Sequence, residues 1–314
     1  MTNIREAGPR FGVSLPPSTN FAHTREVAIA ADEAGLDLIG VQDHPYAPGF
    51  LDTFVAVGDL LSATRRIRVF PDVANLPLRP PAMLAKTAAA LDVVSGGRFE
   101  LALGAGGYWD AITRMGVPRR TPREANAALA EAIAVLRALW RGDGEPVHLD
   151  GEFYSLDGVA SGPAPAHPIE IWTGAQGPRA LDLTGAVADG WAAPIASYLP
   201  YEQWAGANRR IDEAARRAGR APGDLRRVAQ LVGAITPHDG DPRVERGAEP
   251  VRGTPAEWAR IIATLAIEQP FTSFVFWPED PTIQQVDAYA REVVPLVHDL
   301  LARPASRTPS AVDC

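Results

Sequence analysis

The sequence predicts an α/β protein folded as a closed (β/α)8 TIM barrel, with a short hairpin inserted after its fourth helix. Short apolar runs alternate with longer amphipathic stretches along the 314 residues, and strands separated by helices pair in parallel. Eight such strand–helix units close into a barrel. The 28 glycines and 29 prolines fall mostly between the apolar runs, which indicates many short loops. An open doubly wound sheet with a second domain is the alternative architecture.

The first half of the chain supplies four strand–helix units. Pro16-Pro17 ends the first strand, Gly35 stops the first helix, and Pro80-Pro81 opens the third helix at a turn where proline is tolerated. The expected strands are residues 11–15, 38–41, 67–73 and 99–103. The expected helices are residues 24–34, 52–64, 80–94 and 121–140.

The second half repeats this scheme after an inserted hairpin at residues 148–156, with Asp150-Gly151 near its centre. The expected strands are residues 169–172, 190–193, 228–235 and 274–277, with a polar loop at 237–253. The expected helices are residues 178–187, 201–218, 254–267 and 282–302. We therefore expect a single barrel domain over residues 1–302, and a disordered tail from Arg303 to Cys314.

Composition narrows the class of protein. An apolar fraction of 46% and a charged fraction of 22% are ordinary globular values and exclude wholesale disorder. A net charge of −8, spread along the chain, argues against nucleic acid as a partner. One cysteine, Cys314, gives neither a disulfide nor a cysteine-ligated metal site, and no metal is expected from the histidine spacing. No apolar stretch reaches 18 residues and residues 1–10 are polar, so we expect no membrane association and a cytoplasmic location.

The strand ends hold the residues that could carry chemistry, because reactive groups of such barrels lie there. The second strand ends in Gln42-Asp43-His44-Pro45. His44 is the candidate catalytic acid or base, since imidazole titrates near neutral pH and the adjacent Asp43 can orient it or tune its pKa. The alternative is that these residues only shape a turn.

Two glycine-rich runs follow the fourth and fifth strands, and both could bring backbone N–H groups close to a phosphate. Arg179, at the following helix start, is a candidate for an added charge-assisted bond, or else a solvated surface arginine. Neither run matches the phosphate-loop or dinucleotide pattern, and tight turns are the alternative explanation. The runs are Gly104-Ala105-Gly106-Gly107 and Gly174-Ala175-Gln176-Gly177-Pro178.

The third strand leaves through a polar, proline-punctuated segment, Asp72-Val73-Ala74-Asn75-Leu76-Pro77, as a bulged strand end would. Aromatic residues near the expected rim could shape a flat pocket for a conjugated ring, or simply fill the core. They are Phe11, Tyr46, Phe50, Tyr108, Trp109, Trp172, Trp191 and Trp277.

Two sets of motifs resemble the luciferase-like flavin-dependent oxidoreductases of the bacterial luciferase superfamily. The more specific is Leu91 to Arg98, read as Leu-Asp-Val-Val-Ser-Gly-Gly-Arg, followed by Leu-Ala-Leu-Gly-Ala-Gly at 101–106. The second is Gly174 to Arg179 together with Ala-Asp-Gly-Trp at 188–191. The resemblance covers about residues 11–300.

The resemblance implies a reduced flavin or deazaflavin at the carboxyl-terminal rim of the barrel. His44 would lie near the ring and the substrate, and a non-proline cis peptide is expected within Asp72 to Asn75. The phosphate pocket would follow strands four and five, and the protein would be a homodimer. The implied cofactor-binding residues are Asp72, Val73, Ala74, Asn75, Gly104, Ala105, Gly106, Gly107, Gly174, Ala175, Gln176, Gly177, Pro178 and Arg179.

The cofactor could be the deazaflavin coenzyme F-420 or FMN. The Asp-His after strand two and the Gly-Pro-Arg after strand five favour F-420, as does Gly104-Ala105-Gly106 where some flavin-using members have an arginine.

The resemblance implies hydride transfer to, or oxygenation of, a small organic substrate whose identity cannot be read. The alternatives are a non-catalytic flavin-binding barrel, or a hydrolase that uses carboxylates such as Asp43 and Glu279.

Overall fold

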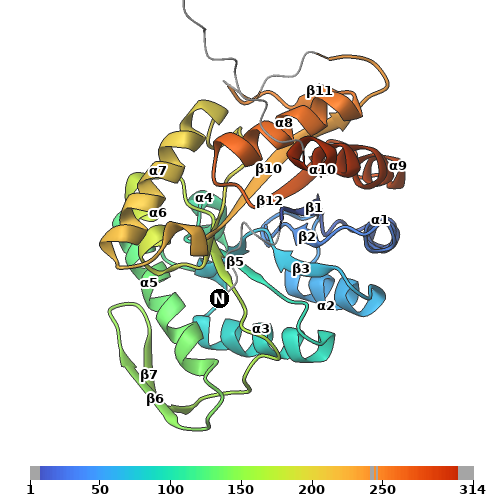
Figure 1. The fold of residues 1–314 in the computed structure, drawn as a ribbon. Helices are drawn as coiled ribbons and strands as arrows, with labels where there is room; N and C mark the ends of the chain where they lie inside the picture. The colour runs from blue at the N-terminus through green and yellow to red at the C-terminus, as the bar shows by residue number, and fades with distance from the viewer. Residues whose placement is uncertain (1–7, 241–243, 245–246, 303–314) are drawn as a thin grey trace, which may run out of the picture.

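The computed structural model describes residues 8–240, 244 and 247–302. Within them a mostly parallel sheet runs in the order β3-β2-β1-β12-β10-β9-β8-β5-β4, with β11 beside β10. Figure 1 shows this sheet at the centre of the molecule with helices around it. The strands are β1 (Arg10–Leu15), β2 (Leu38–Val41), β3 (Arg68–Pro71), β4 (Ala74–Asn75), β5 (Leu101–Gly104), β8 (Ile171–Thr173), β9 (Gly190–Ala192), β10 (Arg226–Ile235), β11 (Val251–Gly253) and β12 (Ser273–Pro278).

The two ends of this strand order meet, so the sheet closes into a barrel. β4 pairs with β5, and Val69 of β3 forms a parallel bridge to Phe99, just before β5. β3 and β4 therefore serve as one barrel strand, interrupted at the Asp72–Val73 peptide, which is cis. The predicted (β/α)8 barrel is confirmed, and the open doubly wound sheet is excluded.

Helices connect successive barrel strands, and the predicted hairpin lies after α5. The antiparallel strands β6 (Pro146–Asp150) and β7 (Ser155–Ala160) form this hairpin, which extends from the barrel at the lower left of Figure 1. The helices are α1 (Phe21–Glu33), α2 (Thr53–Ala63), α3 (Pro81–Ser95), α4 (Trp109–Arg114), α5 (Pro122–Leu139), α6 (Pro178–Val187), α7 (Tyr201–Arg217), α8 (Pro255–Glu268), α9 (Ile283–Ala288) and α10 (Val294–Ala302).

Local sequence signals explain where several helices begin and end. Thr121 and Thr254 each form a capping box with the glutamate three residues later, at the starts of α5 and α8. The Asp52 side chain accepts two backbone N–H bonds at the start of α2. Gly96 ends α3 in the left-handed conformation, with a φ of 68°, and Gly35 follows α1 with a φ of 91°.

The interior of the barrel is packed, and its upper layer becomes the floor of the site. Phe70 and Trp172 meet edge to face with 5.0 Å between ring centroids, and Val73 packs on this group from above. The buried interior side chains come from successive strands: Leu38, Phe70, Ala102, Trp172, Ala192, Val228 and Val275.

Many predicted bounds shift by a few residues, and the inserted hairpin spans 146–160 where 148–156 was expected. Other differences concern whole features. The third strand, expected to reach Val73, stops at Pro71, because the chain turns at the next two residues. The expected polar loop at 237–253 contains β11, which exists only through its pairing with β10. The short helix α4 was not expected, and a π-helical turn at Tyr289–Val293 divides the closing helix. The expected disordered tail, 303–314, lies outside the described residues.

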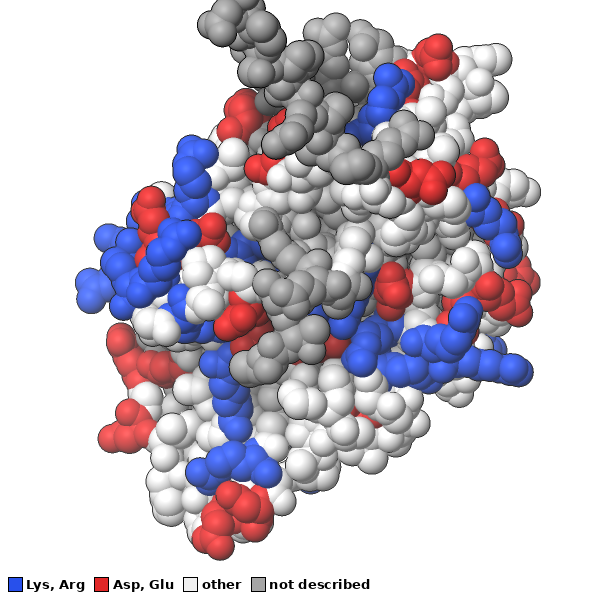
Figure 2. All heavy atoms as spheres, viewed as in Figure 1, with Lys and Arg blue, Asp and Glu red and all other residues white. Residues whose placement is uncertain are grey.

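Surface charge is dispersed. Figure 2 shows acidic and basic side chains interspersed over one face of the molecule, in keeping with the small net charge of −8. None of the helices in the described ranges combines the length and apolar character needed to cross a membrane. In the same residues, no group of three or more His, Cys, Asp or Glu side chains is placed to hold a metal ion.

Candidate active site at the carboxyl ends of the barrel strands

A cavity of about 730 Å³ opens where the barrel strands end. It is lined by the segments that follow β2, β3, β5, β8 and β9, and by side chains of β10 and β12. The structure brings together every predicted site residue except Ala175, which is buried outside the lining and accepts a hydrogen bond from Trp191 Nε1 at 2.9 Å. The predicted residues that line the cavity are Asp43, His44, Asp72, Val73, Ala74, Asn75, Gly104, Ala105, Gly106, Gly107, Gly174, Gln176, Gly177, Pro178 and Arg179.

His44 is half-buried in the wall of this cavity. Its Nδ1 lies 2.8 Å from the Tyr46 hydroxyl, which leaves Nε2 as the ring nitrogen that can meet a ligand. Burial lowers the pKa of His44 below 6.5, and the nearby negative charge of Asp43 only partly opposes this. The imidazole is therefore neutral at neutral pH.

Asp43 does not bond to His44 but holds the exit of the third strand in place. Its fully buried carboxylate accepts two bonds of 2.7 Å from the Arg79 guanidinium and one of 2.8 Å from the backbone N–H of Asn75. The Arg79 guanidinium also lies over the Phe54 ring, 4.4 Å from its centroid. Sequence reasoning missed Arg79, although an arginine directly before Pro80-Pro81 at a strand exit was a usable signal.

The floor of the cavity is the Asp72–Val73 peptide, which lies inside the segment predicted for a cis bond. A Cβ atom on Gly104 or Gly174 would come within 2.8 Å or 3.0 Å of Val73 Cγ2. These glycines are therefore needed for close packing against Val73. Gly177 has open space at the same position and no such neighbour, so its lack of a side chain leaves room in the cavity.

Asp72 lies beneath this floor with few polar partners. Its carboxylate accepts a bond of 3.1 Å from Gln230 Nε2 and a long one of 3.5 Å from Ser14 Oγ. Burial raises the pKa of Asp72 to about 7, and these two bonds only partly offset the effect. Gln230 was missed, although it is the one uncharged polar side chain within the strand β10.

Two buried amide oxygens in the cavity wall have no hydrogen-bond partner among the described residues. They are Oδ1 of Asn75 and Oε1 of Gln230. Unpaired buried polar atoms are costly, so such atoms in a cavity wall indicate a polar ligand that completes them. A flavin or deazaflavin ring, with polar groups along one edge and a flat apolar body, fits this wall.

The opposite end of the cavity has the features that suit an anion. α6 begins at Pro178 after Gly177, and no side chain caps its first turn, in contrast to the capping boxes of α5 and α8. Its first N–H groups are consequently available, and the helix dipole favours negative charge there. Exposed Arg179 adds a positive charge at the same place.

Of the aromatic residues expected near the rim, Tyr46, Tyr108, Trp109 and Trp277 line the cavity. Phe50 packs beside His44, with 6.3 Å between ring centroids. The other three, Phe11, Trp172 and Trp191, are core residues. Tyr198, which also lines the cavity, was not anticipated because it lies in the irregular segment after β9.

The two carboxylates of the hydrolase alternative do not form a pair. Glu279 is outside the cavity lining and holds the Arg252 guanidinium at 2.8 Å and 2.5 Å. Asp43 is engaged by Arg79. General acid and base roles for two carboxylates need both groups at one substrate, which this arrangement does not offer.

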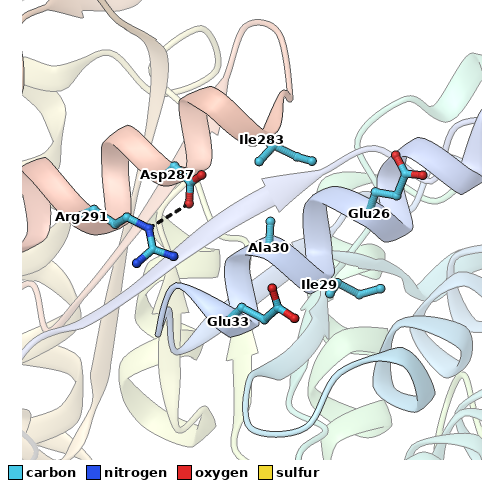
Figure 3. Close-up of a pocket in the computed structure, with 7 residues that line it drawn as sticks. All are labelled: Glu26, Ile29, Ala30, Glu33, Ile283, Asp287 and Arg291. Carbon is cyan, nitrogen blue, oxygen red and sulfur yellow. Dashed lines mark hydrogen bonds and ion pairs between the residues drawn. The ribbon is translucent and has the colours of Figure 1, made fainter.

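A smaller groove of about 370 Å³ lies on the outside of the barrel, between α1 and α9. Figure 3 shows its residues on the two helices, with one ion pair between Arg291 and Asp287 at 3.1 Å. This pair joins neighbouring turns of one helix at the surface. The described lining also holds Glu26 and Glu33, and neither forms an ion pair with Arg291.

Comparison with known proteins gives one family match. The model of the luciferase-like monooxygenase family matches residues 7–270. An F420-dependent glucose-6-phosphate dehydrogenase of Gordonia bronchialis is 28% identical over 230 residues, which cover 70% of this chain and 65% of that protein. The chain thus spans about two thirds of the length of that curated relative.

Solved structures show the same fold at low identity. An F420-dependent secondary alcohol dehydrogenase, in complex with an F420-acetone adduct, superposes with a TM-score of 0.79 at 19% identity, covering 92% of this chain and 99% of that one. A riboflavin lyase with modified FMN and riboflavin has a TM-score of 0.78 at 16% identity, covering 93% and 92% of the two chains.

Proposed function

Because the chain belongs to the luciferase-like monooxygenase family, we propose that it is an oxidoreductase using a reduced flavin or deazaflavin. It would transfer hydride to, or oxygenate, a small organic substrate. The observation that carries this proposal is the cavity floor of Asp72–Val73 with the unpartnered amide oxygens of Asn75 and Gln230 beside it. A flat, polar-edged ring completes those atoms, and His44 stands at the wall.

We propose coenzyme F-420 as the cofactor, with FMN as the alternative. Relatives named as F420-dependent enzymes support the first, and a structural neighbour holding modified FMN keeps the second open. When bound, the reduced cofactor supplies the hydride or the electrons for oxygen. The ring would lie on Val73, and the phosphate would bind the uncapped start of α6 beside Gly106 and Gly107.

His44 is the catalytic acid–base group of this proposal. With Nδ1 held by Tyr46, a proton moves to or from the substrate oxygen at Nε2. Asp43 acts as a positioning residue, since its bonds to Arg79 and the Asn75 N–H fix the strand exit beneath the ring. The apolar floor and aromatic wall exclude water from the reacting atoms.

Calorimetric titration with F-420 and FMN, each oxidised and reduced, tests this proposal. Gly177→Val should weaken binding at least tenfold, because its added bulk blocks the open space at the start of α6. Arg179→Ala, the matched variant two residues on, should weaken binding less, because main-chain N–H groups hold most of the phosphate. Wild-type affinity in Gly177→Val would place the phosphate elsewhere. Tight FMN binding without F-420 binding would reverse the cofactor choice.

Absence of binding by either cofactor would remove the oxidoreductase proposal as a whole. Binding without turnover of any alcohol, ketone or oxygen-dependent substrate would instead favour the non-catalytic flavin-binding barrel.

We further propose a homodimer that associates through α2 and α3. Two large apolar side chains of α3 are exposed, Met83 by 63% and Val94 by 78%. Val55, on the preceding helix α2, is exposed as well. Isolated exposed apolar residues are ordinary, but a set on two packed helices marks an interaction surface. The cytoplasmic location and the absence of a nucleic-acid partner stay predictions, based on the single Cys314 and the dispersed charge.

A further inference from the structure

Three tyrosines from three different loops meet at the mouth of the cavity, beside His44. Tyr46 follows β2, Tyr108 follows β5 and Tyr198 follows β9; we call them the tyrosine cluster. The ring centroids of Tyr46 and Tyr108 are 6.0 Å apart, and those of Tyr108 and Tyr198 are 6.2 Å apart. The hydroxyls of Tyr108 and Tyr198 are hydrogen-bonded.

The cluster offers ring surface rather than charge. Tyr108 and Tyr198 remain 48% and 46% exposed although both line the cavity, so their rings can still be covered by a ligand. Tyr108 also meets the His44 ring edge to face, at 5.8 Å and 80°. Burial raises the pKa of Tyr198 to about 12, and raises that of Tyr46 further. The hydroxyls of Tyr46 and Tyr198 are therefore uncharged at neutral pH.

The charged groups in the described lining of the cavity are elsewhere. Asp43 is neutralised by Arg79, and Asp72 lies under the floor. Arg179 stands at the start of α6, the end that the cofactor phosphate would take. Among the described lining residues, no arginine or lysine remains for a second anion at the mouth. Recognition of a phosphorylated substrate relies on such cations or on a free helix start.

We propose that the tyrosine cluster binds an uncharged aromatic alcohol or ketone, with its ring against the exposed surfaces of Tyr108 and Tyr198 and its oxygen at His44 Nε2. This inference rests on the proposed function, since it takes His44 as the acid–base group beside the cofactor. It separates this chain from its relative named as a glucose-6-phosphate dehydrogenase, whose named substrate carries a phosphate. Edge and face contacts with the tyrosines give the affinity, and His44 selects for an oxygen next to the ring.

Calorimetry on the full chain tests the inference, with 1-phenylethanol and glucose 6-phosphate as probes, with and without bound F-420. We expect 1-phenylethanol to bind and glucose 6-phosphate to bind at least tenfold more weakly. Tyr198→Ala should weaken 1-phenylethanol binding about tenfold, the scale of one lost aromatic contact. Tyr198→Phe, which keeps the ring, should stay within about threefold of the wild type. Tyr154→Ala, outside the cavity lining, is the control and should change nothing.

The outcomes separate this inference from the proposed function. Absence of F-420 and FMN binding removes the proposed function, whereas the probes can still be titrated into the free protein. If the cofactor binds but glucose 6-phosphate binds as tightly as 1-phenylethanol, the inference is overturned and the oxidoreductase proposal stands. Failure of 1-phenylethanol to bind, or wild-type binding in Tyr198→Ala, also overturns it.

Discussion

The neighbour of a functional side chain in sequence is not its partner in space, and His44 illustrates this. The adjacent Asp43 points its carboxylate at Arg79 and the Asn75 N–H, while the His44 ring is held by Tyr46, two residues on. Asp43 affects His44 only through its negative charge, which raises the pKa of His44 and so partly offsets the lowering caused by burial. The pair predicted as one catalytic unit therefore has separate contacts, and our proposal gives proton transfer to His44 and positioning to Asp43.

His44→Gln should leave cofactor affinity unchanged and reduce turnover about 10²–10⁴-fold, the usual scale for a lost general acid or base. Burial lowers the pKa of His44 below 6.5. In the direction of alcohol oxidation, which needs neutral imidazole, the wild-type rate should therefore fall only below about that pH. The kcat/KM profile between pH 5 and 8 is the measurement. A His44→Gln variant that keeps both the rate and the acid limb would remove His44 from the mechanism.

Asp72→Asn should raise the free energy of unfolding at pH 8 and have a smaller effect at pH 5. The pKa of Asp72 is raised to about 7 in the folded protein, above its ordinary 3.8. The folded chain therefore binds this proton more tightly, and stability falls as pH rises from about 4 to 7. Asparagine keeps the shape and can still accept from Gln230. Urea unfolding of the cofactor-free chain at the two pH values measures the difference.

Asp32→Asn is the control with the opposite sign. The Asp32 carboxylate accepts N–H bonds from residues 65, 66 and 67. These bonds outweigh burial and lower its pKa, so its contribution to stability is present at neutral pH and lost in acid. The Asn variant should be less stable than the wild type at pH 8. An Asp72→Asn variant that is also less stable at pH 8 would contradict the raised pKa of the buried Asp72 carboxyl.

At the scale of elements, the sequence predicts best where a local signal ends a segment. Both bounds of β2 and of α6 agree with the expected residues, 38–41 and 178–187. Gly177-Pro178 marks the start of α6, and Gly35 ends the helix that precedes β2. The helix α4 has six residues and no cap from a side chain, so nothing local distinguishes it from a loop. β11 is an extended segment that becomes a strand only beside β10.

The site residues also divide into those that a local sequence pattern predicts and those that depend on distant parts of the chain. Residues at or just beyond a strand end, such as Gly104 and His44, are predictable because barrel topology carries every strand end to one rim. Gln230 and Tyr198 are not, since one lies within a strand and the other far into an irregular segment. The role of Gly104 and Gly174 in packing against Val73 depends on a contact between segments that are about 30 to 100 residues apart, which no local pattern encodes.

A buried ionic network fixes the segment between the hairpin and β8. His167 bonds to Asp92 at 2.7 Å and Glu100 at 3.3 Å, and its backbone N–H donates to Asp92 at 3.0 Å. The hydrogen bonds to Asp92 and Glu100 raise the pKa of His167 to about 9. The charged imidazole therefore links α3 and β5 to the chain that follows the hairpin.

His167→Gln should remove a pH-dependent part of the stability. Because the folded pKa lies above the ordinary 6.5, this contribution is complete below about pH 6.5 and is lost as pH rises through about 9. Wild-type free energy of unfolding should fall between pH 7 and 9.5, and the variant should be less stable at pH 7 with a flatter profile. His148→Gln, in the exposed pair with Asp157, is the control and should follow the wild type. Parallel profiles for wild type and His167→Gln would contradict the network's role.

For the whole molecule, the closed barrel has a packed interior, a cavity at the carboxyl ends of its strands and an outer surface formed by the helices. Phe70 and Trp172 fill the centre, so the cavity at the strand ends has a solid floor and opens only at the rim. The outer helices cover the sheet and present their other faces to solvent. A single domain over 1–302 stays a prediction, while the outer faces of α2 and α3 carry the exposed apolar residues expected of a subunit contact.

The double variant Met83→Glu/Val94→Glu should convert the proposed dimer into a monomer without affecting the cavity. Both side chains lie on α3, one near each end, and are exposed by 63% and 78% in the single chain. Burying them against a second copy would stabilise the dimer, whereas carboxylates placed there would have to be desolvated without a partner.

Sedimentation equilibrium should give twice the mass of one 33.5 kDa chain for the wild type. Ile267→Glu, on an equally exposed residue of α8, should remain dimeric. A wild type that is monomeric at micromolar concentration, or a double variant that stays dimeric, would show that α2 and α3 face solvent and not a partner.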